Sequence, residues 1–310
     1  MAHFANILHD EAFKVVLSEP SNNRLLIKLV EFFLPGKHIA SLSLDDKEQH
    51  GLILSEKNST FDLFCTTDTG ERLIVEMQFS QQDSFQDRML YYATYPIRSQ
   101  IMRQLKELNE TPEEERRKMD YRLNPVYVIS ILNFKLPHER TDTLEEGLIS
   151  RYDIRSERSG ELMTDALHFV YLELGRLRWN KDEWAQCGSL LEQLAFSLKY
   201  GHLLGERPVT FEDELLRLLY DATEFARMEP GQIRILNAIM TTELDIIAQK
   251  AFERKEGRRE GLEEGREEGR EEERRAVVLK SLKLGLSPEM ISQITGLTVE
   301  EVNAQASQNQ

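Results

Sequence analysis

The beginning of the chain shows apolar residues at helical spacing. From Asp10 to Leu34 they recur on one face, and the Pro35-Gly36 pair closes the run. The polar stretch PSNN at 20–23 interrupts this pattern, and proline restricts the backbone there. We therefore predict two consecutive helices at the start of the chain.

Strand patterns come next. Residues 60–66 and 72–79 are rich in apolar and β-branched side chains, and Asp68-Thr69-Gly70 lies between them. A three-residue loop that ends in glycine is a recognised hairpin connection, because glycine tolerates positive φ. We predict a β-hairpin here, preceded by a short extended stretch at 51–54.

Helical spacing returns at 85–108, where Pro96 is expected to kink or interrupt the helix. A charged surface turn or helix end follows at 113–118. The segment PVYVISILNF at 125–134 is apolar on both faces, as in a buried central strand. Helix, hairpin, helix and strand in this order predict a mixed α/β core with helices packed on a sheet.

The second half continues with two more predicted strands, 149–154 and 166–174, joined through Ser159-Gly160. Residues 182–252 have helical patterns. Their candidate core residues are Trp184, Leu190, Leu191, Leu194 and Phe196. We interpret 1–135 as the core and 136–252 as an α/β and then helical extension packed on it.

The character of the chain changes at Lys255. Glycine recurs every four residues in KEGRREGLEEGREEGREEE, and each glycine costs a helix about 1 kcal/mol relative to alanine. Glu and Arg four residues apart return a few tenths of a kcal/mol per pair. We predict a marginal helix or pliable linker over 253–275, with a helix-packing seam through the glycines as the alternative.

The sequence pattern of residues 276–310 predicts three short helices. Ser287 and Pro288 have the N-cap and N1 preferences of a helix start, and Thr298 with Glu301 has the pattern of a capping box. Three short helices with tight glycine turns resemble a helix-turn-helix. A small helical cap or an oligomerisation element is the alternative, since the last helix is acidic.

Composition adds three constraints. The net charge of −15 opposes a simple electrostatic DNA binder, but residues 1–135 hold 16 basic and 20 acidic side chains and carry only −4 of it. The two cysteines, Cys65 and Cys187, form neither a zinc pattern nor a disulfide framework. No signal sequence or apolar span is evident. We expect a cytoplasmic protein without a membrane segment.

The predicted hairpin brings two carboxylates together. If Thr67 faces Glu71 across the loop, Asp62 lies opposite Glu76, with Cβ atoms about 4.5–5.5 Å apart. Such a pair repels unless one group is protonated or a divalent cation lies between them. Oxygen ligands of this kind suit Mg²⁺ or Mn²⁺. Gln78 points to the same side of its strand.

Two alternatives remain at this stage. A bulge at Gly70 would shift the register by one residue. The two acids would also be ordinary residues if they lay on the exposed face of an amphipathic hairpin.

The run FDLFCTTDTGERLIVEMQFSQQDSFQDRMLYYATYPIRSQI resembles the core of the PD-(D/E)XK nuclease family transposases, also called Rpn-type recombination-promoting nucleases. The resemblance extends to HDEAFKVVL, PSNNRLLIKLVEFFL, NPVYVISILNF and GELMTDALHFVYLELGRL. The charged linker and the GLSPEMISQITGLTVEEV ending are also similar to the family. The resemblance covers most of the chain, and it implies an α/β fold with a restriction-endonuclease-like mixed sheet flanked by helices.

The resemblance also implies site residues. Asp62 and Glu76 become metal ligands, joined by the backbone carbonyl of Met77, and Gln78 takes the position where the wider PD-(D/E)XK group has lysine. Asp10 is a candidate supporting acid, with a helix cap as the alternative. Arg88 and Tyr92 on the following helix are candidates for phosphate contact or for packing.

The implied function is hydrolysis of DNA phosphodiester bonds with Mg²⁺ or Mn²⁺, without a prediction of strand transfer. DNA is the expected partner, and a homo-oligomer is compatible with the sequence. Two other functions stay open. One is a nuclease fold kept as an inactive interaction or regulatory module. The other is a DNA-binding regulator that acts through the C-terminal helices.

Overall fold

The computed structural model describes residues 3–45, 62–110, 122–137 and 147–307. The chain forms two units, Met1–Ile239 and Met240–Gln310. The predicted extended stretch at 51–54 and the charged turn at 113–118 lie outside the described residues.

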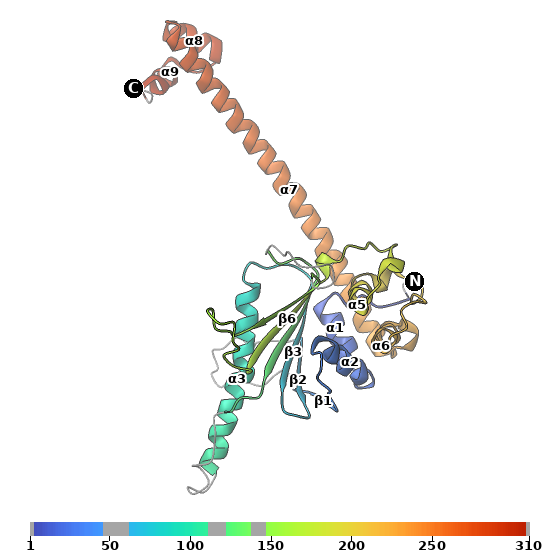
Figure 1. Ribbon diagram of the computed structural model, residues 1–310. Coiled ribbons are helices and arrows are strands. Elements are labelled where there is room, and N and C mark those ends of the chain that lie inside the picture. The colour runs from blue at the N-terminus through green and yellow to red at the C-terminus, as the bar shows by residue number, and fades with distance from the viewer. Residues whose placement is uncertain (1–2, 46–61, 111–121, 138–146, 308–310) are drawn as a thin grey trace. The chain divides into compact units, whose positions relative to one another are not determined.

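A sheet formed by six strands of the described residues organises the first unit (Figure 1). Its order is β1-β2-β3-β4-β6-β5. The central pairs β3–β4 and β4–β6 are parallel, whereas β1–β2, β2–β3 and β5–β6 are antiparallel. The strands are β1 (Leu42–Leu44), β2 (Leu63–Thr67), β3 (Arg72–Gln78), β4 (Val126–Leu132), β5 (Ile149–Asp153) and β6 (Leu167–Glu173).

Helices cover both faces of this sheet. The α-helices of the described residues are α1 (Asp10–Leu17), α2 (Asn23–Phe33), α3 (Phe85–Glu110), α5 (Leu190–Tyr200), α6 (Glu214–Thr223), α7 (Pro230–Lys283), α8 (Pro288–Thr295) and α9 (Val299–Ser307). Short 3-10 turns are η1 (Pro20–Asn22), η2 (Leu174–Arg176), η3 (Trp184–Gln186), η4 (Gly201–Leu203) and η5 (Phe225–Arg227). Figure 1 shows α1, α2, α5 and α6 together on one side of the sheet and α3 on the other.

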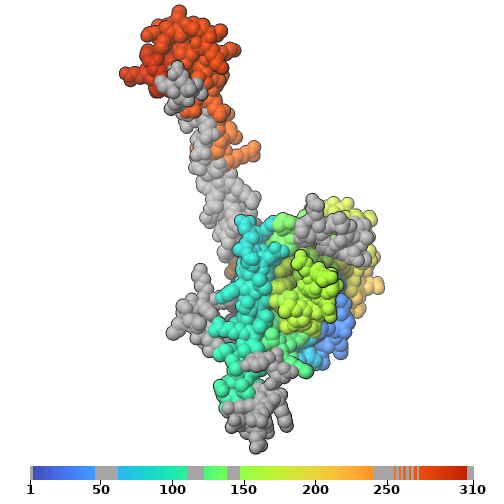
Figure 2. All heavy atoms as spheres, turned by 60° about the vertical axis from the view of Figure 1, so that its left-hand side comes forward, coloured from blue at the N-terminus to red at the C-terminus, as the bar shows by residue number. Residues whose placement is uncertain are grey.

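Alternation along the strands separates two cores. In β4, Tyr127 and Ile129 pack into the larger core with α1, α2, α5 and α6, whereas Val126 and Val128 pack into the smaller core beneath α3. Every residue of β4 is buried, because this strand has neighbours on both edges and helices on both faces. Figure 2 shows α3 at the surface, with the β5 and β6 segment beside it. The mixed sheet between helices confirms the predicted restriction-endonuclease-like α/β fold.

Most predicted elements of this unit are confirmed. The first helical run divides at η1 into α1 and α2, and the hairpin consists of β2 and β3. The two strands β5 and β6 pair as an antiparallel hairpin through the turn that contains Gly160. Of the proposed core residues, Leu194 and Phe196 are fully buried, and Trp184, Leu190 and Leu191 pack against that core partly exposed. Strand β1 was not predicted.

The helix α3 continues through Pro96 without interruption. Of the two predicted effects of this proline, a kink or an interruption, the interruption is therefore wrong. Proline removes one backbone donor, but both sides of it are held by other contacts. Ala93 is buried in the core beneath the helix. Beyond the proline, the side chain of Gln100 accepts a hydrogen bond from the Asn124 backbone N–H (2.7 Å) and donates to the Asn124 carbonyl (3.2 Å). Tertiary anchoring therefore keeps the helix continuous.

The second unit contains most of α7 together with α8 and α9. The glycine-punctuated segment is part of α7, so the helical alternative of the linker prediction is confirmed. Gly285 and Gly296 have positive φ where α7 and α8 end, and the Thr298–Glu301 capping box forms as predicted. Val278, Ile291 and Val302 form the small core of this unit. Within the described parts of the chain, no helix combines the length and apolar character that a membrane crossing requires.

Candidate metal centre

The hairpin register sets two carboxylates opposite each other. The pairs from Leu63–Val75 to Thr66–Arg72, continued by one residue, place Asp62 opposite Glu76. The loop glycine, Gly70, has φ +87° and introduces no bulge that shifts the strands. The predicted register is therefore confirmed.

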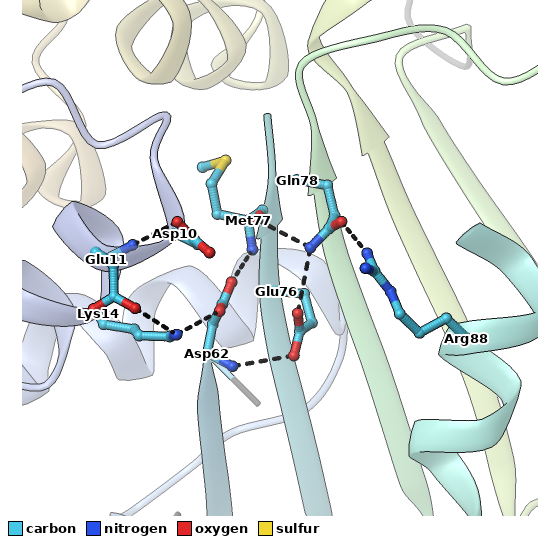
Figure 3. A network of polar contacts seen from close by, with 8 residues as sticks. All are labelled: Asp10, Glu11, Lys14, Asp62, Glu76, Met77, Gln78 and Arg88. Carbon is cyan, nitrogen blue, oxygen red and sulfur yellow. Dashed lines mark hydrogen bonds and ion pairs between the residues drawn. The ribbon is translucent and has the colours of Figure 1, made fainter. Parts of the chain in front are cut away.

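Hydrogen bonds hold each carboxylate against the opposing strand (Figure 3). The Asp62 backbone N–H donates to Glu76 Oε1 (3.1 Å), and the Met77 backbone N–H donates to Asp62 Oδ2 (2.7 Å). These bonds fix one oxygen of each carboxylate. Asp62 Oδ1 and Glu76 Oε2 are left for other partners.

Both carboxylates are buried. Asp62 is 3% exposed and Glu76 is 2% exposed. The interpretation of the pair as ordinary residues on the wet face of a hairpin is therefore wrong. Two adjacent buried carboxylates are costly unless a proton or a cation compensates them, because both lose hydration and repel each other.

The pKa values of the pair reflect this cost. Burial, and then the charge of Asp62, raises the pKa of Glu76 to about 8. Burial also raises the pKa of Asp62 above its usual value, although the Met77 N–H and Lys14 oppose the shift. In the absence of a cation, burial and the neighbouring charge therefore favour the protonated form of Glu76.

This shift predicts a pH dependence for the stability of the metal-free protein. Glu76 releases its proton near its ordinary value of 4.5 when unfolded, but at about 8 when folded. The folded state thus binds more protons between these values, so this contribution is full below the unfolded pKa and is lost as pH rises through the folded pKa. We expect the melting temperature in EDTA to fall between about pH 5.5 and pH 8.5.

The Glu76→Gln variant is the control, because glutamine cannot titrate and should flatten this pH dependence. An equal pH dependence in the parent and in this variant would show that another group causes it.

Lys14 joins this site, and no sequence pattern pointed to it. Its Nζ lies 3.2 Å from Asp62 Oδ1 and 3.4 Å from Glu11 Oε1, and its side chain is 12% exposed. Burial lowers the pKa of Lys14, but the charge and hydrogen bond of Asp62 outweigh burial and raise it. In the sequence, Lys14 has no feature that distinguishes it from a surface lysine of an amphipathic helix.

Gln78 lies on the other side of the pair. Its Nε2 donates to the Met77 carbonyl (3.2 Å) and to Glu76 Oε2 (3.5 Å), and its Oε1 accepts a hydrogen bond from Arg88 Nη2. Arg88 Nη1 also donates to Gln82 Oε1 (2.6 Å). The Arg88 side chain therefore orients the Gln78 amide, so that its N–H groups face the proposed metal ligands.

Tyr92 follows one turn after Arg88 on α3. Its ring centroid lies 5.9 Å from the Arg88 guanidinium carbon, within the range of a cation–π contact. Burial, and then the charge of Glu76, raises the pKa of Tyr92. Of the two candidates on this helix, Arg88 donates a hydrogen bond to Gln78, and the Tyr92 ring packs against Arg88.

Asp10 begins α1 and is exposed. Its Oδ1 accepts a hydrogen bond from the Glu11 backbone N–H (2.9 Å), and its charge contributes to the raised pKa values of Asp62 and Lys14. Asp10 therefore lies near the pair. Its role as a supporting metal ligand stays a prediction.

The donor atoms at this centre fit a hard divalent cation. Asp62, Glu76 and the Met77 carbonyl offer only oxygen atoms as ligands. Lys14 Nζ now contacts Asp62 Oδ1, and Gln78 Nε2 donates to Glu76 Oε2 and to the Met77 carbonyl. The described residues contain no cluster of three or more His, Cys, Asp or Glu side chains suited to a metal. The oxygen donors that lie together here are two carboxylates and a backbone carbonyl.

The C-terminal helices offer a less suitable surface for DNA. The sequences of α8 and α9 contain no lysine or arginine, and the first turn of α9 contains Glu300 and Glu301. Phosphate contacts depend on such basic side chains.

Comparison with known proteins adds one match. A family model described as PD-(D/E)XK nuclease family transposase matches residues 7–252. No curated protein and no protein of solved structure matches the chain. The matched range contains every residue of the candidate centre.

Proposed function

The chain belongs to the PD-(D/E)XK nuclease family transposases, and we propose that it is an endonuclease that hydrolyses DNA with Mg²⁺ or Mn²⁺. Membership of this family implies a nuclease-type function linked to mobile DNA. The buried carboxylate pair of Asp62 and Glu76 carries the proposal. Such a pair supplies the negative charge that holds a cation where water and phosphate meet.

Asp62, Glu76 and the Met77 carbonyl would hold the cation. When bound, it lowers the pKa of a water molecule and neutralises charge that develops on the phosphate. To admit it, the Gln78 amide would have to give up its contact with Glu76 Oε2, and Lys14 its contact with Asp62 Oδ1. Both side chains have rotatable bonds that permit this movement.

Gln78 would then orient the attacking water. The amide accepts or donates hydrogen bonds but adds no charge, in contrast to the lysine found at this position in the wider group. Arg88 holds the amide through Gln78 Oε1 and adds positive charge on the side of α3. The reaction adds water across one P–O bond of the backbone, and strand transfer is not part of the proposal.

The test is incubation of the purified protein with supercoiled plasmid in Mg²⁺, in Mn²⁺ and in EDTA. We expect nicked or linear DNA with either cation and none with EDTA. Intact plasmid under all three conditions would overturn the endonuclease proposal and would favour an inactive nuclease-fold module.

A further inference from the structure

Lys14 is a cationic group at the centre that the hairpin motif does not contain. It comes from α1, whose residues Ala12, Phe13, Val16 and Leu17 are buried and anchor the helix. This anchoring brings the lysine to the open end of the hairpin, where its Nζ lies 3.2 Å from Asp62 Oδ1. In Figure 3 Lys14 approaches Asp62 from one side, and Gln78 with Arg88 lies on the other.

The distribution of charge makes Lys14 distinct from Arg88. Among the described residues, Lys14 alone forms an ion pair with either carboxylate of the centre. Arg88 is already engaged by Gln78 and Gln82 and contacts the carboxylates only through the Gln78 amide. Lys14 is therefore the cation with direct access to the place where a metal and a phosphate would meet.

A metal at this centre would compete with Lys14. The ammonium group and a divalent cation repel each other, and a cation held by Asp62 would take the oxygen Oδ1 that Lys14 now contacts, because Oδ2 accepts from the Met77 N–H. The lysine side chain is long and flexible, and Glu11 Oε1, 3.4 Å from Nζ, gives it a second acceptor beside Asp62. A displaced ammonium group next to a metal-bound DNA backbone has a phosphate oxygen as its natural partner, because lysine binds phosphate as a point charge.

We infer that Lys14 exchanges Asp62 for a non-bridging oxygen of the DNA phosphate when the cation is bound. In this role Lys14 supplies from α1 the positive charge that Gln78 cannot supply from β3. The inference rests on the proposed function and adds a phosphate-contacting residue to it.

The Lys14→Met variant separates this role from a structural one, because the expected effects have opposite signs. Removal of the competing ammonium group should leave Mn²⁺ affinity equal or higher, as measured by calorimetry. Loss of the phosphate contact should lower the single-turnover cleavage rate at saturating Mn²⁺ by about 10–100-fold. Binding to a labelled duplex in Ca²⁺ should show a salt dependence with a slope smaller by about 0.9, as for one lost phosphate contact.

Three further variants sharpen the experiment. Lys14→Gln is a second neutral side chain in case methionine disturbs folding, and Lys14→Arg keeps the charge and should recover part of the cleavage rate. Lys28→Met is the matched control, since Lys28 pairs with Glu31 (2.9 Å) on the neighbouring helix α2. It should change neither Mn²⁺ affinity nor the cleavage rate.

Each other outcome is decisive. If the parent cleaves and the neutral Lys14 variants cleave equally fast at saturating Mn²⁺, the inference fails and the proposed function stands. If these variants lose Mn²⁺ affinity and thermal stability together, Lys14 is structural and the inference fails. A parent that does not cleave overturns the proposed function and this inference with it.

Discussion

The Glu76→Gln variant is expected to lose cleavage of supercoiled plasmid by about 100-fold or more, because it removes one preorganised charge of the metal centre. Glutamine keeps the shape of the side chain, and its amide can still contact the Asp62 backbone N–H that Glu76 Oε1 accepts at 3.1 Å. The loss should therefore come from the missing charge. The measurement is the rate of nicking at saturating Mn²⁺, with circular dichroism to confirm the fold.

Glu71→Gln is the matched control for this variant. Glu71 lies on the same hairpin but at the loop end, where it pairs with Lys37. The substitution removes the same charge from the hairpin and should leave cleavage near the parental rate. Equal rates in the parent and in Glu76→Gln would show that Glu76 is not a metal ligand.

The Asp62→Asn variant is expected to lose the stabilisation that Mn²⁺ gives to the parent. A ligand that binds only the folded state stabilises it by about 2.7 kcal/mol at 100 times its Kd. At about 2–4 °C per kcal/mol for a unit of this size, the parent should melt roughly 5–10 °C higher in Mn²⁺ than in EDTA. The variant should show little or no shift, because it lacks one of the two ligand carboxylates.

Asp45→Asn provides the comparison for Asp62. Asp45 Oδ2 also pairs with a basic side chain, Arg72 Nη1, at 3.2 Å, and Arg72 lies at the start of β3, four residues before Glu76. Its metal response should equal that of the parent. A Mn²⁺ shift of the same size in Asp62→Asn would contradict the metal centre, and it would do so without any measurement of cleavage.

The sequence was sufficient for features that short stretches determine. The register of β2 and β3 follows from the loop Asp68-Thr69-Gly70, because a tight turn leaves few ways to pair the adjacent strands. That register was enough to place Asp62 beside Glu76. The turns at Gly285 and Gly296 and the cap at Thr298 are local in the same sense, since each depends on residues within one helical turn.

The tertiary structure decided which distant strands pair and whether a helix continues. The parallel neighbours of β4 are distant in the sequence, and β1 is too short to show a strand pattern. The continuation of α3 through Pro96 depends on packing and on Gln100, and propensity alone does not predict it.

The candidate centre shows the same division. Its carboxylates and Gln78 lie on one hairpin, so their spacing in the sequence carries their geometry. Their burial depends on the helices packed around the hairpin, and their spacing in the sequence is also compatible with an exposed pair. Lys14 and Arg88 reach the centre from α1 and α3, and only the packing of these helices on the sheet brings their charges to it. Charge contacts between distant segments leave no periodic pattern in the chain, because they depend on the path of the backbone between them.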